Sequence, residues 1–322
     1  MSENPKVSVM IITYNQAHFI RETLDSVLGQ DYPKMEIVVA DDASTDGNQE
    51  IIKEYAAKFP KIIKPVFNQH NLGITGNSNA AFFACRGELI SIMGGDDLFL
   101  PGKLSAQVEV FKDPEVVLCY HPVEIFDSAT NKTLFISDQL KREQITCAED
   151  IIARGGIQGA SSIMVRRSAC PIKGFDPRIP TVSEWLFFIE VALQGKVLKI
   201  DQVLSRYRKH GSGASDRTLD LLDETLLTLD LVLEKYPDQR DLAQYCRAGK
   251  ARYVAGEIFR QLDKRNIEQA YKLARQALSY SPTSLKYKLI FSFCRLLHQN
   301  RSLVGVVLVL SKMKYFLKKY FG

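Results

Sequence analysis

The stretch Met35-Glu-Ile-Val-Val-Ala-Asp-Asp-Ala-Ser-Thr-Asp-Gly47 passes from an apolar, β-branched run directly into two aspartates and a polar turn. A run of this length predicts a buried strand, and the polar residues after it predict a turn into a helix. A similar apolar run, Val7-Ser-Val-Met-Ile-Ile-Thr13, comes before it, and a segment with apolar residues at helical spacing joins the two. Strand, helix and strand in this order are typical of a βαβ unit with parallel strands.

The alternation of strands and helices extends along the first two thirds of the chain. Helical spacing predicts a first helix that begins after an N-cap at Asn15, and further helices at 48–59, 75–85 and 183–194. Apolar runs predict further strands at 62–67, 88–93, 116–126, 161–165 and 197–207. We therefore expect an α/β fold with a mostly parallel central sheet flanked by helices.

Helical patterns alone occupy the chain from about residue 216 onward. We expect two domains, an α/β domain over 1–215 and an all-helical C-terminal region over 216–322. A chain of 322 residues is long enough for one large domain and a smaller one. Residues 267–282 have the pattern of a tetratricopeptide helix, but one copy is weak evidence, because such arrays need about three repeats.

Composition argues against several classes of protein. The six cysteines are scattered without a C-x-x-C pair, which argues against a zinc site and a disulfide framework. No secretory signal is expected, and the longest uncharged apolar run, 303–310, is far shorter than the roughly 20 residues of a membrane-spanning helix. No G-x-G-x-x-G follows the first strand and no G-x4-G-K-[ST] occurs, so neither a dinucleotide fold nor a P-loop is predicted.

Polar clusters follow three of the predicted strands: Thr13-Tyr14-Asn15, Asp41-Asp42 and Gly94-Gly95-Asp96-Asp97. Ligands of open parallel sheets bind outside the carboxyl ends of the strands. The alternative is that Asp41, Asp42 and Ser44 only cap the next helix. Two aspartate pairs at neighbouring strand ends favour a binding site, because carboxylates there are costly unless solvated, paired or bound to metal. Without a glycine-rich loop, a divalent cation bound by Asp96 is the simplest way to neutralise the negative charge of a bound phosphate group.

Taken together, these segments resemble the family 2 inverting glycosyltransferases. The resemblance covers roughly the first 215 residues and is carried by 7–16, 19–30, 36–46, Asn71-Leu-Gly73, Gly94-Gly-Asp-Asp-Leu-Phe-Leu-Pro-Gly-Lys-Leu104 and Tyr207-Arg-Lys-His-Gly-Ser-Gly-Ala-Ser215. It implies a GT-A fold, a nucleoside-diphosphate sugar as donor (a UDP-sugar above others) and a divalent metal, Mn²⁺ or Mg²⁺. The domain over 1–215 would then be the nucleotide-sugar-binding catalytic domain.

The resemblance also implies roles for individual residues. Asp42 would bind the base of the nucleotide, Asp96 would be the metal-contacting aspartate of the D-x-D element, and His210 would face the diphosphate or the metal. Glu184 aligns with the general base of the family. The implied nucleotide-sugar site comprises Thr13, Tyr14, Asn15, Asp42, Asp96 and His210, and the implied metal ligands are Asp96 and His210.

The sequence departs from the family pattern at three positions. Gly94 replaces the first aspartate of D-x-D, which removes one carboxylate from the site. The base is Glu184 rather than aspartate, longer by one C–C bond of about 1.5 Å. Ser78 stands where the family often has an arginine. Purely structural roles stay open for three residues. Glu184 can be a surface carboxylate at the start of a helix, and His210 can be a loop histidine with a satisfied ring. Trp185 can pack in the core instead of stacking against an acceptor sugar.

The C-terminal part of the chain is strongly basic. Residues 271–322 contain ten Lys or Arg and no Asp or Glu, although the whole chain has a net charge of only +5. A helix over 306–321 would carry apolar residues on one arc and lysines on the other, which is typical of a helix in the headgroup region of an anionic membrane. The alternative is a packed helix with solvated lysines. Nucleic acid is not expected as a partner, because no standard binding module is present.

These observations predict an inverting glycosyltransferase that adds a sugar to a glycan acceptor, which we expect to be lipid-linked and part of surface-polysaccharide synthesis. We expect it in the cytoplasm, peripheral on the inner face of the plasma membrane. A sugar-phosphate nucleotidyltransferase would need a glycine-rich, basic segment after the first strand, which Thr13-Tyr-Asn-Gln-Ala-His18 is not. A catalytically degenerate nucleotide-sugar-binding protein that recruits partners remains an alternative because of Gly94 and Glu184.

Overall fold

The computed structural model describes residues 4–137, 144–157, 159–211, 221–239 and 241–300. The chain divides into two compact units, residues 1–228 and 229–322. The boundary predicted between residues 215 and 216 falls within residues 212–220, which lie outside the described part, and it stays a prediction.

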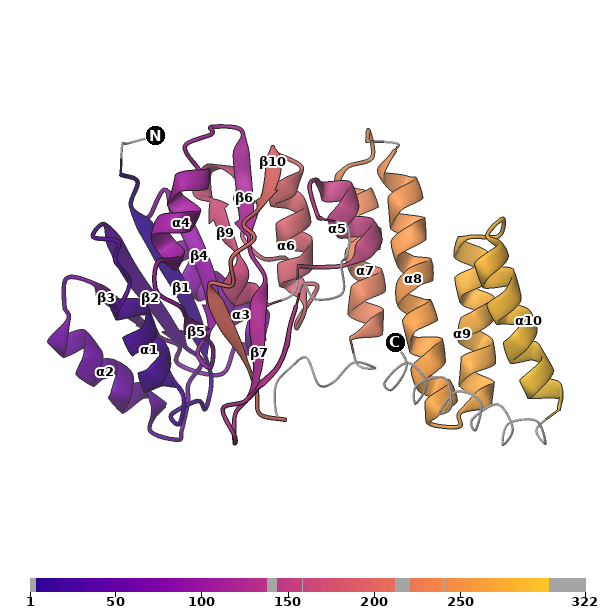
Figure 1. The fold of residues 1–322 in the computed structure, drawn as a ribbon, viewed down its shortest axis with the longest axis horizontal. Helices are drawn as coiled ribbons and strands as arrows, with labels where there is room; N and C mark the ends of the chain where they lie inside the picture. The colour runs from indigo at the N-terminus through magenta and orange to yellow at the C-terminus, as the bar shows by residue number, and fades with distance from the viewer. Residues whose placement is uncertain (1–3, 138–143, 158, 212–220, 240, 301–322) are drawn as a thin grey trace. The chain divides into compact units, whose positions relative to one another are not determined.

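The main sheet of the first unit has, within the described residues, seven strands in the order β10-β6-β9-β4-β1-β2-β3 (Figure 1). Strand β1 lies between β2 and β4 and runs parallel to both, while β9 is antiparallel to its neighbours β4 and β6. The mostly parallel sheet expected from the sequence is therefore confirmed. The strands are β1 (Val7–Thr13), β2 (Met35–Asp41), β3 (Ile63–Phe67), β4 (Leu89–Gly94), β6 (Val116–Tyr120), β9 (Met164–Arg166) and β10 (Lys196–Lys199).

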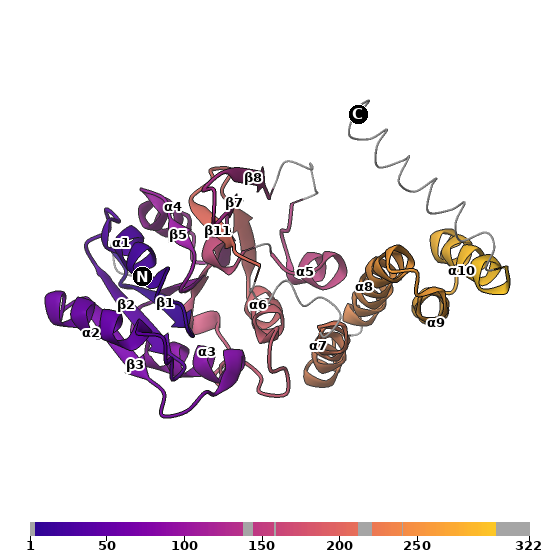
Figure 2. The ribbon, with the colours of Figure 1, turned by 90° about the horizontal axis from the view of Figure 1, so that it is seen from below.

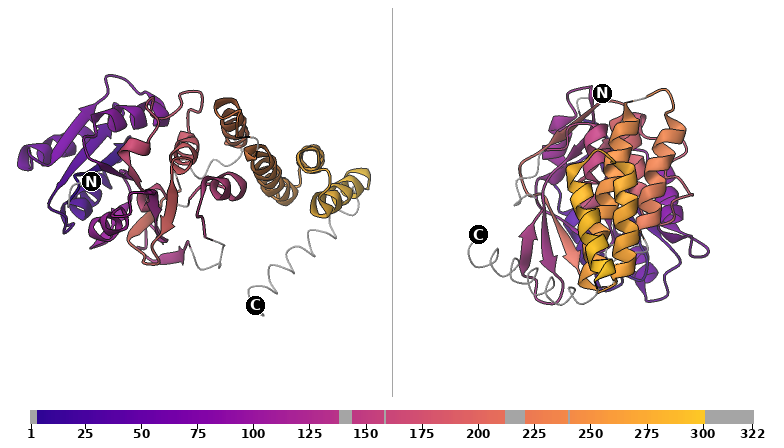
Figure 3. Two further views of the ribbon diagram at one scale, coloured as in Figure 1. Left: turned by 90° about the horizontal axis from the view of Figure 1, so that it is seen from above. Right: turned by 90° about the vertical axis from the view of Figure 1, so that its right-hand side faces the viewer.

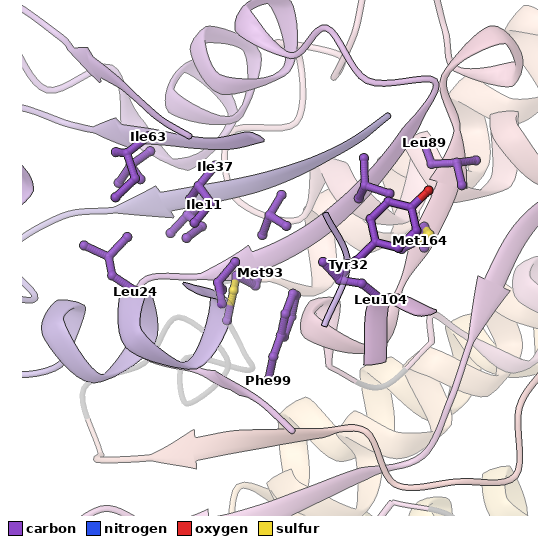
Figure 4. Packing of buried hydrophobic residues seen from close by; sticks show 14 of the residues in the cluster. Ile11, Leu24, Tyr32, Ile37, Ile63, Leu89, Met93, Phe99, Leu104 and Met164 are labelled. Atoms are coloured by element: carbon purple, nitrogen blue, oxygen red, sulfur yellow. The ribbon is translucent and has the colours of Figure 1, made fainter. Parts of the chain in front are cut away.

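Helices cover both faces of this sheet. Figure 2 shows α1 and α4 on one side and α3 and α6 on the other. Residues 7, 9 and 11 of β1 point to the same face and join residues of α1, α2 and α4 in one apolar core, part of which Figure 4 shows. The helices of this unit are α1 (Ile20–Leu28), α2 (Asn48–Lys58), α3 (Gly73–Ala84), α4 (Lys103–Val110), α5 (Ala148–Arg154) and α6 (Ser183–Ala192).

A smaller sheet has the order β5-β11-β7-β8, from β5 (Leu98–Phe99), β11 (Ser205–Lys209), β7 (Val123–Asp127) and β8 (Thr133–Ile136). The prediction of one strand over 116–126 is wrong in one respect. The segment forms two strands, β6 and β7, which belong to different sheets. Pro122, which has no N–H to donate to a ladder, lies between them. The strand predicted over 197–207 likewise divides into β10 and β11.

The side chain of Lys103 is completely buried among these elements. Lys103 of α4 donates hydrogen bonds from Nζ to Ser91 Oγ at 2.8 Å and to Gln107 Oε1 at 2.6 Å, and Nζ lies 4.0 Å from the centroid of the Phe99 ring. These partners are all neutral. Burial lowers the pKa of Lys103 to about 7, because the charged ammonium loses its hydration.

We expect this lysine to make stability depend on pH. The folded-state pKa lies below the ordinary value of 10.5, so between pH 7 and pH 10 the unfolded chain binds more protons and alkaline pH favours folding. The free energy of unfolding of the wild type should therefore rise relative to Lys103→Met by roughly 1 kcal/mol per pH unit over this window. Urea unfolding of both proteins from pH 6 to pH 10 measures the difference, and parallel curves would contradict it.

The second unit is helical throughout its described part, which confirms the expected helical C-terminal region. Helix α7 (Leu222–Lys235) crosses the limit between the units and is followed by α8 (Leu242–Asp263), α9 (Ile267–Tyr280) and α10 (Leu285–Gln299). Helix α9 packs against both α8 and α10 (Figure 3). Its N-cap Asn266 accepts a hydrogen bond from Gln269 N. The amphipathic helix predicted over 306–321 lies outside the described residues. Among the helices that are described, none has the length and apolarity to cross a membrane.

Candidate active site at the carboxyl edge of the main sheet

Three of the predicted polar clusters lie at one edge of the main sheet. The register pairs Thr13 with Asp41 and Ile12 with Gly94, so β1, β2 and β4 end at the same level. Two further backbone hydrogen bonds, from Asp42 N to Thr13 O and from Gly95 N to Ile12 O, extend this alignment beyond the strands. The three clusters therefore converge, as expected for the carboxyl ends of neighbouring parallel strands.

The first aspartate after β2 organises its own loop. Asp41 is fully buried and accepts hydrogen bonds from Ser44 N, Asn48 Nδ2 and Gln49 Nε2 at 2.7 to 2.9 Å. These contacts occupy both carboxylate oxygens with groups of the following turn and of α2. Asp41 therefore holds the turn before α2 and binds two side chains of that helix, and none of these contacts is with a backbone N–H of α2.

The second aspartate, Asp42, is bound to a different helix. Its carboxylate accepts the backbone N–H groups of Leu72 and Gly73, at 2.8 and 2.9 Å, where α3 begins, and Asn68 Nδ2 donates to it at 2.9 Å. Free N–H groups and the positive end of the dipole at a helix N-terminus stabilise such a carboxylate. The part predicted for Asp42 in binding the base stays a prediction, and in this structure its carboxylate also positions α3.

Two asparagines that the sequence reasoning missed link these elements. Asn77 of α3 donates from Nδ2 to Thr13 O and Ala40 O, so it joins the ends of β1 and β2. Asn68 donates to Asn77 Oδ1 as well as to Asp42. Asn68 directly follows β3, so the rule that singled out the other strand-end clusters could also have found it.

The loop after β1 differs from the expectation. The predicted N-cap at Asn15 is wrong: α1 begins at Ile20 after Phe19. Asn15 instead has φ of +50°, which its short polar side chain tolerates, and it exchanges hydrogen bonds with Ser44 and Thr45 of the neighbouring loop. Of the predicted residues Thr13, Tyr14 and Asn15, Thr13 is buried beneath the loop, whereas Tyr14 is 48% exposed.

The two residues predicted to hold a metal lie together. His210, which follows β11, places Nε2 at 2.9 Å from Asp96 Oδ2, although the residues are 114 positions apart in the sequence. Both side chains are largely buried, and the His210 ring lies 5.1 Å from the ring of Phe19. A loop histidine satisfied by a neighbouring carboxylate makes the same contact, so the assignment of His210 to a metal stays a prediction.

Arg208, two residues before His210, holds the backbone of this pair. Its Nε donates to Asp96 O at 2.7 Å, its Nη2 donates to Glu22 at 2.6 Å, and its backbone N–H donates to the carboxylate of Asp97 at 3.1 Å. Burial, with the nearby charge of Asp96 as a second cause, raises the pKa of Asp97 above its usual range.

Two glycines set the space around Asp96. A Cβ at Gly94 would lie 2.6 Å from Asp96 Oδ1, so the carboxylate occupies the space next to the position where the family pattern has another aspartate. A Cβ at Gly95 would lie 2.6 Å from Gln16 Oε1 and 2.7 Å from the side chain of Thr13. Gly95 therefore allows close packing of the turn against the loop after β1.

The side chains of Asp96 and His210 could bind a divalent cation only if a bound nucleotide or water supplied the remaining ligands. Within the described residues, no group of three or more His, Cys, Asp or Glu side chains is placed to hold a metal. Two adjacent ligands of an octahedral ion, each at about 2.1 Å, lie about 3 Å apart, and Asp96 Oδ2 and His210 Nε2 already have a separation of 2.9 Å. Mg²⁺ and similar ions commonly combine one or two protein ligands with water and phosphate oxygens.

Glu184 lies in the first turn of α6 and is partly buried. Burial is the main cause that raises its pKa to about 7. A hydrogen bond from its own backbone N–H acts in the opposite direction, and the charge of Glu224 adds to the rise. A carboxyl group with this pKa changes protonation state near neutral pH, which is the property of an effective general base. The next residue, Trp185, is buried and donates its indole N–H to Ile151 O, so it packs in the core.

The segment that leads into α6 is anchored from two other helices. Thr75 of α3 donates to Ile179 O at 2.6 Å and contacts Ser183 Oγ at 2.7 Å. Glu224 of α7 accepts the backbone N–H groups of Thr181 and Val182 on one oxygen, Oε2, at 2.8 and 3.0 Å. Sequence reasoning missed Glu224, because only the tertiary fold brings residue 224 to residues 181 and 182.

Comparisons with known proteins identify the family of this chain. The family model described as glycosyl transferase family 2 matches residues 8–169. An uncharacterized protein of Mycobacterium tuberculosis is 33% identical over 212 residues, which are 64% of this chain and 60% of that protein, so the chain spans three fifths of this relative's length. The putative glycosyltransferase EpsE of Bacillus subtilis is 30% identical over 202 residues, 61% of this chain and 70% of EpsE.

Solved structures share the fold. The structure of Staphylococcus aureus TarS 1–349 in complex with UDP-GlcNAc has a TM-score of 0.65 and 18% identity, covering 92% of this chain and 87% of that one. A mannosyltransferase of Pyrobaculum calidifontis in complex with GDP-Man and Mn²⁺ has a TM-score of 0.58 and 18% identity, covering 99% of this chain and 89% of that one. At these identities the likeness concerns the fold alone, and it confirms the expected GT-A-like α/β class.

Proposed function

The chain belongs to glycosyl transferase family 2, and from this premise we propose that it moves a sugar from a nucleoside-diphosphate sugar to a hydroxyl group of a glycan acceptor, with inversion. The observation that carries the proposal is the contact of Asp96 with His210 at the sheet edge where the polar loops of β1, β2 and β4 converge. We infer a UDP-sugar as donor, and the UDP-GlcNAc complex of TarS, which has the same fold, supports this inference.

Asp96 and His210 would hold a divalent cation, Mn²⁺ or Mg²⁺, which supplies positive charge to the diphosphate as it leaves. The Mn²⁺ complex of the mannosyltransferase with the same fold supports this assignment. Within this chain, Arg208 holds the main chain at Asp96, and His210 contacts its carboxylate. We place Thr13, Tyr14, Asn15 and Asp42 around the nucleotide, with exposed Tyr14 as the aromatic side chain that can contact it directly.

Glu184 would take the proton from the acceptor hydroxyl. Its partly buried position raises the pKa to about 7, so a substantial fraction of the carboxyl group is ionised at neutral pH while its basicity exceeds that of an exposed glutamate. The anchors at Thr75 and Glu224 hold the start of α6, and we propose that they position this carboxylate.

Glu224 offers a test of this arrangement through pH. Glu224→Gln keeps an oxygen that can accept both N–H groups, because Oε2 alone accepts them in the wild type, but it removes the negative charge that helps raise the pKa of Glu184. We expect the acid limb of the kcat/KM profile to move to lower pH with little loss of stability. The control Asp223→Asn removes an exposed charge from the same helix and should leave the profile in place. An unmoved acid limb in Glu224→Gln would contradict the coupling.

The alternative of a catalytically degenerate sugar-nucleotide-binding protein is favoured by one observation, the single carboxylate that Gly94 leaves at the metal site. A screen of nucleotide sugars, with and without Mn²⁺, decides between the two by thermal stabilisation and by release of nucleoside diphosphate. Metal-dependent release with one donor supports the transferase. Stabilisation without release by any donor supports the degenerate protein, and neither effect would overturn both. Membership of the family argues against a sugar-phosphate nucleotidyltransferase.

We propose that the acceptor is a lipid-linked glycan of surface-polysaccharide synthesis and that the protein is peripheral on the inner face of the plasma membrane. The support is the charge of residues 271–322, ten Lys or Arg and no Asp or Glu. Basic residues next to apolar ones attract a protein to anionic lipid, whose headgroups would bring the acceptor within reach.

A further inference from the structure

Helix α10 has two apolar faces, and only one of them is packed. The inner face carries Tyr287, Cys294 and Leu297, which are buried in the unit where α10 packs against α9. The outer face carries four large apolar side chains that are exposed to solvent: Leu285 at 70%, Leu289 at 62%, Phe293 at 38% and Leu296 at 49%. Helix α10 is the last described helix of the row α8, α9, α10 in Figure 3.

The four exposed side chains form one continuous stripe. At 100° per residue they fall within an arc of about 80°, so they follow one another along the same side of the helix. The arc has cationic borders, with Lys286 on one side and Lys288 and Arg295 on the other, and all three are exposed. We call these seven residues the α10 outer face: Leu285, Lys286, Lys288, Leu289, Phe293, Arg295 and Leu296.

An apolar stripe of this size on a surface helix indicates a partner, and the charges around it decide which one. A second copy of the chain across a two-fold axis would bring the same cations together, because an isologous interface pairs identical surfaces. The segment 301–322 carries five further Lys or Arg and no acidic residue, so it also adds like charge. A layer of anionic headgroups above acyl chains complements both the stripe and its cationic borders.

We propose that the α10 outer face docks on an anionic lipid surface, with its leucines and Phe293 at the level of the acyl boundary and its cations among the headgroups. This rests on the membrane partnership proposed above and makes it specific, because it assigns the contact to a described helix rather than to residues 303–322. The face then holds the helical unit against the membrane in a defined orientation.

Co-sedimentation of the full chain with vesicles tests the assignment. The vesicles are phosphatidylcholine alone or with 30% phosphatidylglycerol, over a series of salt concentrations. We expect Lys286→Gln/Lys288→Gln/Arg295→Gln to bind anionic vesicles roughly 100-fold more weakly than wild type at low salt, since each cation contributes about fivefold. Leu289→Gln/Phe293→Gln should bind roughly tenfold more weakly, because apolar burial is lost.

Matched controls separate this surface from general effects of charge and apolarity. Lys61→Gln/Lys132→Gln/Lys173→Gln removes the same charge from exposed positions of the first unit, and Leu134→Gln/Ile172→Gln removes exposed apolar side chains there. Both controls should bind as the wild type does. Circular dichroism and metal-dependent release of nucleoside diphosphate, measured without vesicles, show that the α10 variants are folded and that the donor site is intact.

Three outcomes would overturn the inference. In the first, the α10 variants bind vesicles as the wild type does and removal of residues 303–322 abolishes binding, which would mean that the protein binds the membrane through another surface. In the second, the wild type binds neutral and anionic vesicles equally, or neither. In the third, light scattering shows a dimer that Leu289→Gln/Phe293→Gln makes monomeric with vesicle binding unchanged, in which case the face joins two copies. None of these outcomes depends on transfer activity, so failure here is distinct from failure of the proposed reaction.

Discussion

Turnover should fall by at least about 100-fold when Glu184 is replaced by glutamine, the usual scale for losing a general base. The amide has nearly the shape of the carboxyl group but accepts no proton at neutral pH. Donor binding should persist, because no residue placed around the nucleotide is changed. The wild-type kcat/KM should rise with pH through an apparent pKa near 7, and this limb should vanish in the variant, because the titrating group is gone.

A matched control is Glu50→Gln, which makes the same substitution in the first turn of another helix, α2, at an exposed position. It should leave turnover and its pH profile unchanged. Initial rates of nucleoside-diphosphate release with saturating donor, measured at saturating and at subsaturating acceptor from pH 5 to pH 9, give the turnover and the kcat/KM profile. If Glu184→Gln turns over at the wild-type rate, the base lies elsewhere in the chain.

Transfer should be abolished in Asp96→Ala, together with the metal-dependent part of nucleoside-diphosphate binding. The fold should survive, because Arg208 bonds to the backbone oxygen of Asp96, which alanine retains. Calorimetric titration with UDP, with and without Mn²⁺, measures the binding directly and needs no acceptor. The expected result is a loss of the Mn²⁺ effect that His210→Ala shares in part, since the two side chains are 2.9 Å apart.

Asp201→Ala serves as the control, because this aspartate is 80% exposed and is paired with Lys199, which is not among the residues placed at the site. It should bind UDP as the wild type does, with the same gain from Mn²⁺. Full activity of the wild type in EDTA, or full activity of Asp96→Ala, would show that the diphosphate is stabilised without this cation.

The local sequence pattern is sufficient to predict strands and turns, which depend on short stretches of the chain. The apolar run at 35–40 and the turn after it predict β2 and its polar end correctly, because strand and turn preferences act over a few residues. The contact of Asp96 with His210 was anticipated through the resemblance to a known family. Periodicity alone contains no information about two residues separated by 114 positions.

The expectations failed where tertiary contacts decide the outcome. Asn15 has the character of a helix N-cap, yet hydrogen bonds to the loop after β2 hold it at φ of +50°. The apolar run across Pro122 reads as one strand, because hydrophobicity does not reveal which of two sheets a residue joins. The roles of Arg208 and Glu224 could not be predicted from local sequence, because the residues that they bind are far away in the chain.

The smaller sheet also has a consequence for the order in which the molecule is assembled. Strand β11 pairs with β7 and β5, which precede it by about eighty to one hundred residues, and it carries His210 to Asp96. Pairings over such distances close large loops and form slowly, whereas β1, α1 and β2 are neighbours in the chain. During synthesis the first half can therefore collapse around β1 and β2 well before β11 has left the ribosome. The contact of His210 with Asp96 is therefore completed only after most of the first unit has been synthesised.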